Sequence, residues 1–216
     1  MTENSKSPTV ETYALNGSHA RNYNDFMQSM SDVQFCQRLL SEHKDLLLDQ
    51  SPGSNLPNPQ DDLRRAIWTS IIVRYFTCFK SSASRRSLNP DKVFSGNKGA
   101  KDNFHHMKHV RDKNIVHDEN GSSMSNVVVQ IVDGIPEHEF KCFTVGAGIV
   151  STHIAAMENL LQMTTHYIQQ QLAVLSNLVQ EQFRKMSIDD VRRLKEFEIN
   201  IDAAMYEPWK IRNRLD

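Results

Sequence analysis

The chain has few cysteines, few glycines and no long apolar run, and each shortage excludes a class of protein. Its 216 residues include 3 cysteines, 8 glycines and 7 prolines. No apolar stretch approaches the about 20 residues that a membrane-spanning helix requires. The first residues also lack the charged-then-apolar layout of a secretory signal. We therefore expect a cytoplasmic protein with no membrane partner.

The charge balance excludes two further classes. The formal net charge is -1 at pH 7 and 39% of the residues are hydrophobic, which is typical of a globular protein rather than a disordered or membrane one. A chain of this length is long enough to bury one good core and short for two independent ones. We expect one domain, without an internal repeat.

The cysteines are odd in number and far apart in the sequence. Cys36, Cys78 and Cys142 each lie in an apolar pattern. Their spacing matches neither a disulfide framework nor a zinc site. All three are expected to be reduced packing residues.

Apolar spacing predicts an all-α helical bundle with one small insertion. Residues 1–24 are polar without periodicity and are expected to form a flexible arm. A helical domain follows over residues 25–198, and residues 199–216 form a tail. A β-branched run and turn residues predict a β-hairpin at about 127–145, before a long helix. Helices are expected over residues 25–49, 60–79, 89–93, 102–118 and 150–185, and a capping box at Ser187 and Asp190 opens another.

The helix expected over residues 102–118 carries an arginine on its apolar face. With Phe104 at zero, a step of about 100° per residue places Met107 at about 300° and Ile115 at about 20°. Arg111 falls between them, at about 340°. A guanidinium keeps its proton, so burying it costs several kcal/mol unless an anion or acceptors receive it. Either a partner carboxylate lies opposite Arg111, or this face opens onto an anionic ligand.

A histidine follows Arg111 where the helix should end. The last turn of a helix has unpaired carbonyls and a negative dipole end, so His117 can titrate near neutrality. Arginine supplies a planar donor fork for phosphate oxygens, and histidine supplies a mobile proton. Together they are the minimum set for cleaving RNA without a metal. In that reaction the ribose 2′-hydroxyl attacks the adjacent phosphate while the cation stabilises the phosphorus centre.

These two side chains do not project together from a straight helix. His117 falls at about 220° on the same wheel, about 120° from Arg111. They converge if the helix unwinds at His117, or if two copies of the motif meet across a dimer axis. We therefore expect a homodimer whose composite cleft holds two arginines and two histidines.

Basic residues gather in the middle of the chain. Between Arg64 and Lys113, lysine and arginine far outnumber the acids. A shared basic surface would attract a polyanion such as RNA, with binding that weakens as salt rises. The alternative is a solvated loop that is rich in lysine. Arg74, Lys108 and Lys113 are the candidate phosphate-binding residues.

The same helix is also rich in histidine. His105 and His109 are one turn apart and could share a metal. However, no glutamate follows the first histidine as in metalloproteases, and no third ligand is visible in the sequence. We expect exposed histidines here, with no metal and no cofactor.

The segment RDKNIVH resembles the motif of the HEPN superfamily, in which an arginine and a polar residue precede a histidine that closes a helix. The helix AIWTSIIVRYFTCFK before it and the turn DENG after it are similar to that family as well. The resemblance covers best about residues 60–120, and it points to the small stand-alone proteins of bacterial defence and abortive-infection systems. It implies a HEPN-like bundle, a symmetric dimer and metal-independent endoribonuclease activity at a cleft lined by both subunits.

Carried over by position, the resemblance assigns three catalytic residues. Arg111 and His117 match the two principal positions of the motif, and Asp112 matches the polar position after the arginine. Asp112 would orient the site or pair with Arg111 or Lys113. Val116 stands where many relatives have a small residue.

Three functions stay open at this point. The first is a ribonuclease, a toxin or defence effector that acts on structured RNA such as tRNA and that a separately encoded antitoxin would restrain. The second is a non-catalytic helical module that binds nucleic acid, a nucleotide or a partner protein. In the third, Arg111 and Asp112 simply anchor a helix end and His117 caps its carbonyls.

Overall fold

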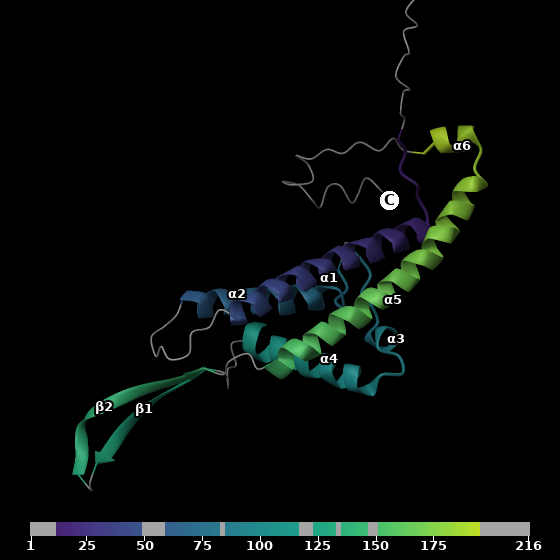
Figure 1. Ribbon diagram of the computed structural model, residues 1–216. Helices are drawn as coiled ribbons and strands as arrows, with labels where there is room; N and C mark the ends of the chain where they lie inside the picture. Colours follow the sequence, from purple (N-terminus) through teal and green to yellow (C-terminus); the bar gives the residue numbers. More distant parts are fainter. Residues whose placement is uncertain are drawn as a thin grey trace, which may run out of the picture. The chain divides into compact units, whose positions relative to one another are not determined.

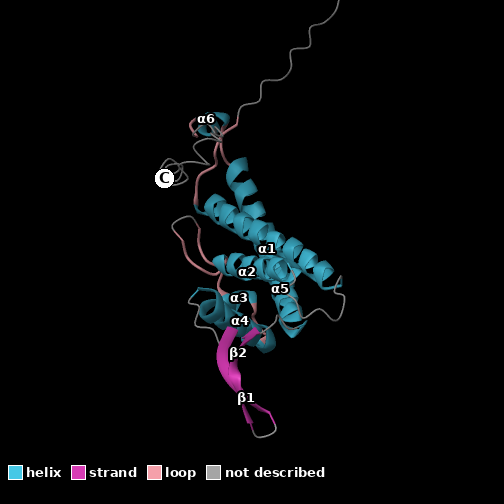
Figure 2. Cartoon of the chain, turned by 90° about the vertical axis from the view of Figure 1, so that its left-hand side faces the viewer, coloured by secondary structure: helices cyan, strands magenta, loops and turns pink. Residues whose placement is uncertain are grey.

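The computed structural model describes residues 12–48, 59–82, 85–116, 123–132, 135–146 and 151–194. Most of these residues are helical, and the predicted all-α class is confirmed (Figures 1 and 2). In chain order the elements are α1 (Ser18–Leu48), α2 (Pro59–Thr77), α3 (Pro90–Val93), α4 (Lys98–Val110), a π-helix η1 (Arg111–Val116), β1 (Ser123–Val132), β2 (Ile135–Gly146), α5 (Ser151–Arg184) and α6 (Ile188–Arg192). Within the described residues, no helix is long and apolar enough to cross a membrane.

The predicted β-hairpin is present and longer than expected. Strands β1 and β2 pair antiparallel, and Ser123 lies opposite Gly146 at one end of the ladder. The register shifts between Val129 and Ile131. The prediction of about 127–145 missed the first part of β1, where Ser123 and Ser125 give no β-branched signal.

Contacts divide the described residues into two compact units. Of the described residues, one unit holds α1 up to Gln28, the residues around Ser82–Arg86, and Gln169–Leu194. The other holds the rest of α1, then α2 to η1, the hairpin, and α5 up to Ile168. Helix α5 has 34 residues and rises about 51 Å, whereas the 19 residues of α2 rise about 28 Å. Helices α1 and α5 each contribute residues to both units.

Helix α2 is the central helix of the larger unit, as its apolar circumference predicted. Ile71, Ile72, Tyr75 and Phe76 are fully buried or nearly so. Full burial of side chains of this size contributes roughly 1.5–3 kcal/mol each. Around them lie buried apolar side chains of the other helices: Val33, Cys36 and Leu40 of α1, Phe104 and Met107 of α4, and Met157, Leu160, Leu161 and Ile168 of α5.

A hydrogen-bonded pair joins the buried faces of α2 and α5. The Tyr75 hydroxyl lies 3.0 Å from Oγ1 of Thr164. Because the Thr164 hydroxyl donates its own hydrogen to the Leu160 carbonyl at 2.7 Å, Tyr75 must be the donor of this bond. Burial raises the pKa of Tyr75, so its phenol keeps the proton that it donates.

Two of the three cysteines are confirmed as reduced packing residues. Cys36 and Cys78 are fully buried, and neither is in a disulfide. The Cys36 thiol donates to the Ile71 carbonyl at 3.5 Å, and burial raises its pKa to about 12. Cys142 lies in β2, and its side chain is outside the described part of the structure.

The first helix begins at Ser18, so the expectation of a flexible arm is wrong for residues 18–24. The Arg21 amide donates to the Gly17 carbonyl at 3.0 Å, and Ala20 is buried. Gly17 has φ +131°, and the Gln182 side chain donates to the Asn16 carbonyl at 3.0 Å. These tertiary contacts order a polar stretch that has no apolar period of its own. Residues 1–11 lie outside the described part of the structure.

The helix that carries the arginine also begins earlier than predicted, at Lys98 rather than at residue 102. Asn97 caps it, because its side-chain oxygen accepts the Ala100 amide at 2.9 Å. The short helix expected at 89–93 and the long helix expected at 150–185 are confirmed as α3 and α5. The predicted capping box of α6 is present at Ser187 and Asp190, whereas the tail over residues 199–216 lies outside the described residues.

Candidate functional site

Arg111 lies directly after the last residue of α4, in line with that helix's buried face. Ala100, Phe104 and Met107 are all buried, and the Arg111 side chain is only 20% exposed. The prediction that this arginine shares an apolar face is therefore confirmed. Its charge must be compensated locally, since few waters reach it.

Aromatic rings pack beneath the guanidinium of Arg111. Cζ of Arg111 lies 5.0 Å from the centroid of the Phe76 ring, an arrangement typical of cation–π contact. The Phe76 ring in turn lies 5.1 Å from that of Phe104. Phe79 and Phe94 continue this cluster, with ring centroids 4.7 and 5.3 Å from that of Phe104. The guanidinium of Arg111 therefore packs against an aromatic part of the core.

The compensating anion is the neighbouring residue, Asp112. Nε of Arg111 donates to Oδ1 of Asp112 at 2.7 Å, and NH2 of Arg111 donates to the same oxygen. Of the two alternatives for the buried cation, the structure shows the partner carboxylate. Asp112 comes from the adjacent position in the motif, not from an opposing helix.

The helix changes type at this arginine. Residues Arg111–Val116 form a π-helix, in which amides donate to the carbonyl five residues before rather than four. The rotation per residue is smaller than in an α-helix, so a helical wheel of about 100° per residue does not describe Arg111–Val116. His117 itself lies outside the described residues. π-Helical turns make up well under 1% of residues and are frequent at functional sites.

The candidate phosphate-binding residues lie in two places. Lys108 and Lys113, on either side of Arg111 in the sequence, are exposed. Arg74 instead contacts α1: its Nε donates to Oδ1 of Asp32 at 2.6 Å, and its guanidinium lies 5.8 Å from the Phe35 ring centroid. No contact among the described residues joins Arg74 to Arg111.

The histidines of α4 are exposed, as expected for His105 and His109. Within the described ranges, no group of three or more His, Cys, Asp or Glu residues is arranged to hold a metal ion. His106 does have a partner that sequence spacing cannot reveal, His153 of α5, with Nε2 atoms 3.3 Å apart. The two helices are separated in the sequence by the β-hairpin, so this pairing is a tertiary contact.

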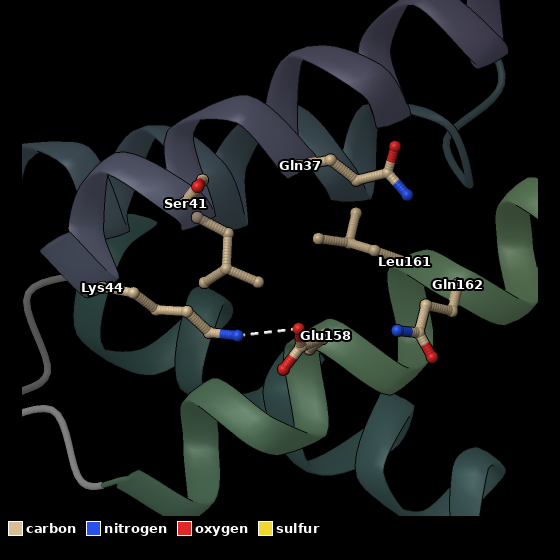
Figure 3. A pocket seen from close by; sticks show the side chains of 7 residues that line it. Gln37, Ser41, Lys44, Glu158, Leu161 and Gln162 are labelled. Atoms are coloured by element: carbon tan, nitrogen blue, oxygen red, sulfur yellow. Dashed lines mark ion pairs between the residues drawn. The ribbon is translucent and has the colours of Figure 1, made fainter.

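A polar pocket of about 260 Å³ lies between α1 and α5 (Figure 3). The ion pair between Nζ of Lys44 and Oε1 of Glu158, 2.7 Å long, bridges its two walls. The Gln37 amide donates to Thr165 at 3.1 Å. The pocket is lined by Gln37, Leu40, Ser41, Lys44, Glu158, Leu161 and Gln162. Its opposite charges neutralise each other and none of the predicted site residues lines it, so the candidate site remains the one at Arg111.

Comparisons with known proteins do not assign this chain to a family. No family model, no curated protein and no solved structure matches it.

Proposed function

We propose that this protein is a metal-independent endoribonuclease of HEPN type, a toxin or defence effector with a composite site at a homodimer interface. The observation that carries the proposal is the setting of Arg111. An arginine on a buried face, held over Phe76 and bound by Asp112, begins the π-helical turn Arg111–Val116, and His117 is the next residue in the sequence. A cation held rigidly in a largely water-excluded place is suited to stabilising charge on a phosphate.

Each residue of the motif has one role in the proposed reaction. His117 takes the proton of the ribose 2′-hydroxyl as that oxygen attacks the adjacent phosphorus. The bond between phosphorus and the 5′-oxygen breaks, that oxygen takes a proton from solvent and leaves as a 5′-hydroxyl, and a 2′,3′-cyclic phosphate remains at the 3′ end of the upstream fragment. Arg111 stabilises the charge on the phosphate oxygens, and Asp112 positions its guanidinium. Lys108 and Lys113 are exposed and hold the RNA backbone by charge.

The test is cleavage of total RNA in the presence of EDTA. Wild-type protein should produce fragments with 2′,3′-cyclic phosphate ends, and both Arg111→Ala and His117→Ala should lose this activity by at least about 100-fold. Asp112→Asn keeps an oxygen that accepts from the guanidinium, so it should retain more activity than Asp112→Ala. His109→Ala is the matched control, since it changes an exposed side chain of the same helix. Undiminished cleavage by the Arg111 or His117 variant would remove that residue from the mechanism.

The composite site has its own test. Arg111→Ala and His117→Ala are mixed so that subunits exchange. In each mixed dimer, one subunit keeps His117 and the other keeps Arg111. If the site joins the arginine of one subunit to the histidine of its partner, the mixture recovers activity that neither variant has alone. A strict monomer at micromolar concentration would refute the dimeric site.

A second function is a non-catalytic module that uses the same face to bind nucleic acid, a nucleotide or a partner protein. The contact between Arg111 and Asp112 favours it, because a carboxylate already occupies the guanidinium donors that a reacting phosphate would need. Salt-dependent RNA binding without cleavage, weakened in Lys108→Ala and Lys113→Ala, would support the module over the nuclease.

A further inference from the structure

Two histidines from different helices face each other outside the site at Arg111. His106 is on the exposed side of α4, and His153 is in the first turn of α5. Their Nε2 atoms are 3.3 Å apart, and the ring centroids are 5.3 Å apart at an angle of 41°. Both residues belong to the same compact unit. Their separation is therefore a property of how α4 packs on α5.

A second contact shows that this packing is defined along the whole of α4. The side-chain Nδ2 of Asn97, the residue that caps α4, lies 3.6 Å from the sulfur of Met163 in α5. His106 is near the other end of α4 and contacts His153, which precedes Met163 in the chain. The two helices thus run antiparallel with contacts at both ends. Buried Met107 and Met157, each adjacent to or one turn from a histidine of the pair, support this packing from the core.

The distance between the two nitrogens suits a metal ion. Two nitrogen ligands at about 2.0–2.1 Å from one zinc ion lie about 3.3 Å apart at the tetrahedral angle. We propose that His106 and His153 bind a divalent transition-metal ion through their Nε2 atoms, with zinc as the expected ion and water completing the coordination. The ion clamps α4 to α5 without movement of either helix. This site does not depend on the proposed RNA cleavage, which needs no metal.

The environment of His153 favours its neutral form. Burial lowers the pKa of His153, and the nearby His106 lowers it further. His153 is therefore neutral at neutral pH, as a metal ligand must be. In the metal-free pair, one Nε2–H group donates to the other Nε2; when the ion binds, that proton moves to Nδ1 of the same ring, so both Nε2 lone pairs face the metal. Along α4, the ionisable residues next to His106 are His105 and Lys108, and Asp102 and His109 lie one turn before and after it.

The coordination number sets the expected selectivity. Since no third protein ligand joins the pair among the described residues, binding should be weaker than at a four-ligand structural site. Imidazole nitrogen favours Cu²⁺, Ni²⁺ and Zn²⁺ over Mn²⁺, and Mg²⁺ prefers oxygen ligands. Mg²⁺ is therefore the negative control.

The test uses the full chain, free of any affinity tag, titrated with Zn²⁺ alone by calorimetry and followed by thermal unfolding. Zn²⁺ at about a hundredfold excess over its Kd should raise the Tm by roughly 5–10 °C, whereas Mg²⁺ should not. His106→Gln and His153→Gln should each weaken binding by at least about 10-fold, which at the same Zn²⁺ concentration removes at least about half of this rise in Tm. His105→Gln and His109→Gln, which change exposed histidines of the same helix, should bind Zn²⁺ as the wild type does.

The outcomes separate the metal site from an ordinary hydrogen bond. Circular dichroism shows whether each variant is folded, and both changed residues lie near the surface. Zn²⁺ binding that survives in His106→Gln and His153→Gln would overturn the proposal, as would no binding by the wild type. Loss of binding in His109→Gln alone would place the ion one turn further along α4 and would overturn it as well. RNA cleavage in EDTA is a separate result, so failure of one proposal is distinguishable from failure of the other.

Discussion

His43 is a buried imidazole without hydrogen bonds, and replacing it with leucine should stabilise the protein. Its side chain is fully buried in α1, and neither ring nitrogen has a hydrogen-bond partner in the described structure. A neutral imidazole always carries one N–H group and one acceptor nitrogen. His43→Leu removes both polar groups and keeps an apolar side chain of similar bulk.

The size of the effect follows from two opposing contributions. A buried donor or acceptor without a partner costs about 1–3 kcal/mol. The His43 ring also lies 5.7 Å from the ring of Trp68, and such a contact contributes about 0.5–1.5 kcal/mol that leucine does not replace in full. The free energy of unfolding should therefore increase by about 1 kcal/mol at neutral pH. For a chain of this length that corresponds to a Tm increase of roughly 2–4 °C.

The stability difference between His43→Leu and the wild type should increase as the pH falls. Burial lowers the pKa of His43, and the charge of Arg64 lowers it further. In the unfolded chain the pKa is about 6.5, so below that pH the unfolded state takes up a proton that the folded state does not, and folding weakens as pH falls. At about pH 5.5 this contribution reaches at most about 1.4 kcal/mol. His43→Leu removes it, so the difference between variant and wild type widens by up to that amount.

The measurement is urea unfolding of both proteins at pH 7.5 and pH 5.5 (roughly one pH unit on each side of the unfolded pKa). His109→Leu serves as the control, because it changes an exposed histidine to the same residue. A variant less stable than wild type by more than about 1 kcal/mol, with an unchanged m-value, would refute the reasoning. It would mean that the ring nitrogens of His43 are hydrogen-bonded in solution.

Three further predictions concern the packing that supports the site. Tyr75→Phe removes a buried donor and should lower the free energy of unfolding by about 1 kcal/mol, measured by urea unfolding, while the core stays packed. Asn97→Ala removes the N-cap of α4 and should cost about 1 kcal/mol, whereas Asn97→Gly should cost only a few tenths. In a Cys142→Ser variant, Cys36 and Cys78 should resist a disulfide reagent in the native protein and react once guanidinium chloride unfolds it, because both thiols are buried. Rapid native labelling would show that the core opens at α1 and α2.

Local patterns were enough to predict most of the helices. The apolar circumference of α2 and the capping box at Ser187 each come from neighbours within a few turns, and the structure has both elements. The predictions failed where order comes from distant residues. Ser18 begins a helix in a polar stretch because Gln182 anchors the preceding backbone. The late start predicted for α4 was instead a local error: Asn97 caps the helix, and a cap needs no apolar side chain.

The sequence by itself determined that Arg111 shares the buried face of a helix, because the position of a residue around a helix depends only on spacing along the chain. Tertiary structure decided what that arginine meets. Only the packing of α2 against α4 puts Phe76 beneath the guanidinium. Only the structure shows that Arg111–Val116 is π-helical, with a rotation per residue that differs from that of an α-helix. The contact between His106 and His153 is likewise a product of helix packing. Spacing predicts which face a side chain occupies, whereas its partners depend on long-range contacts that no local pattern encodes.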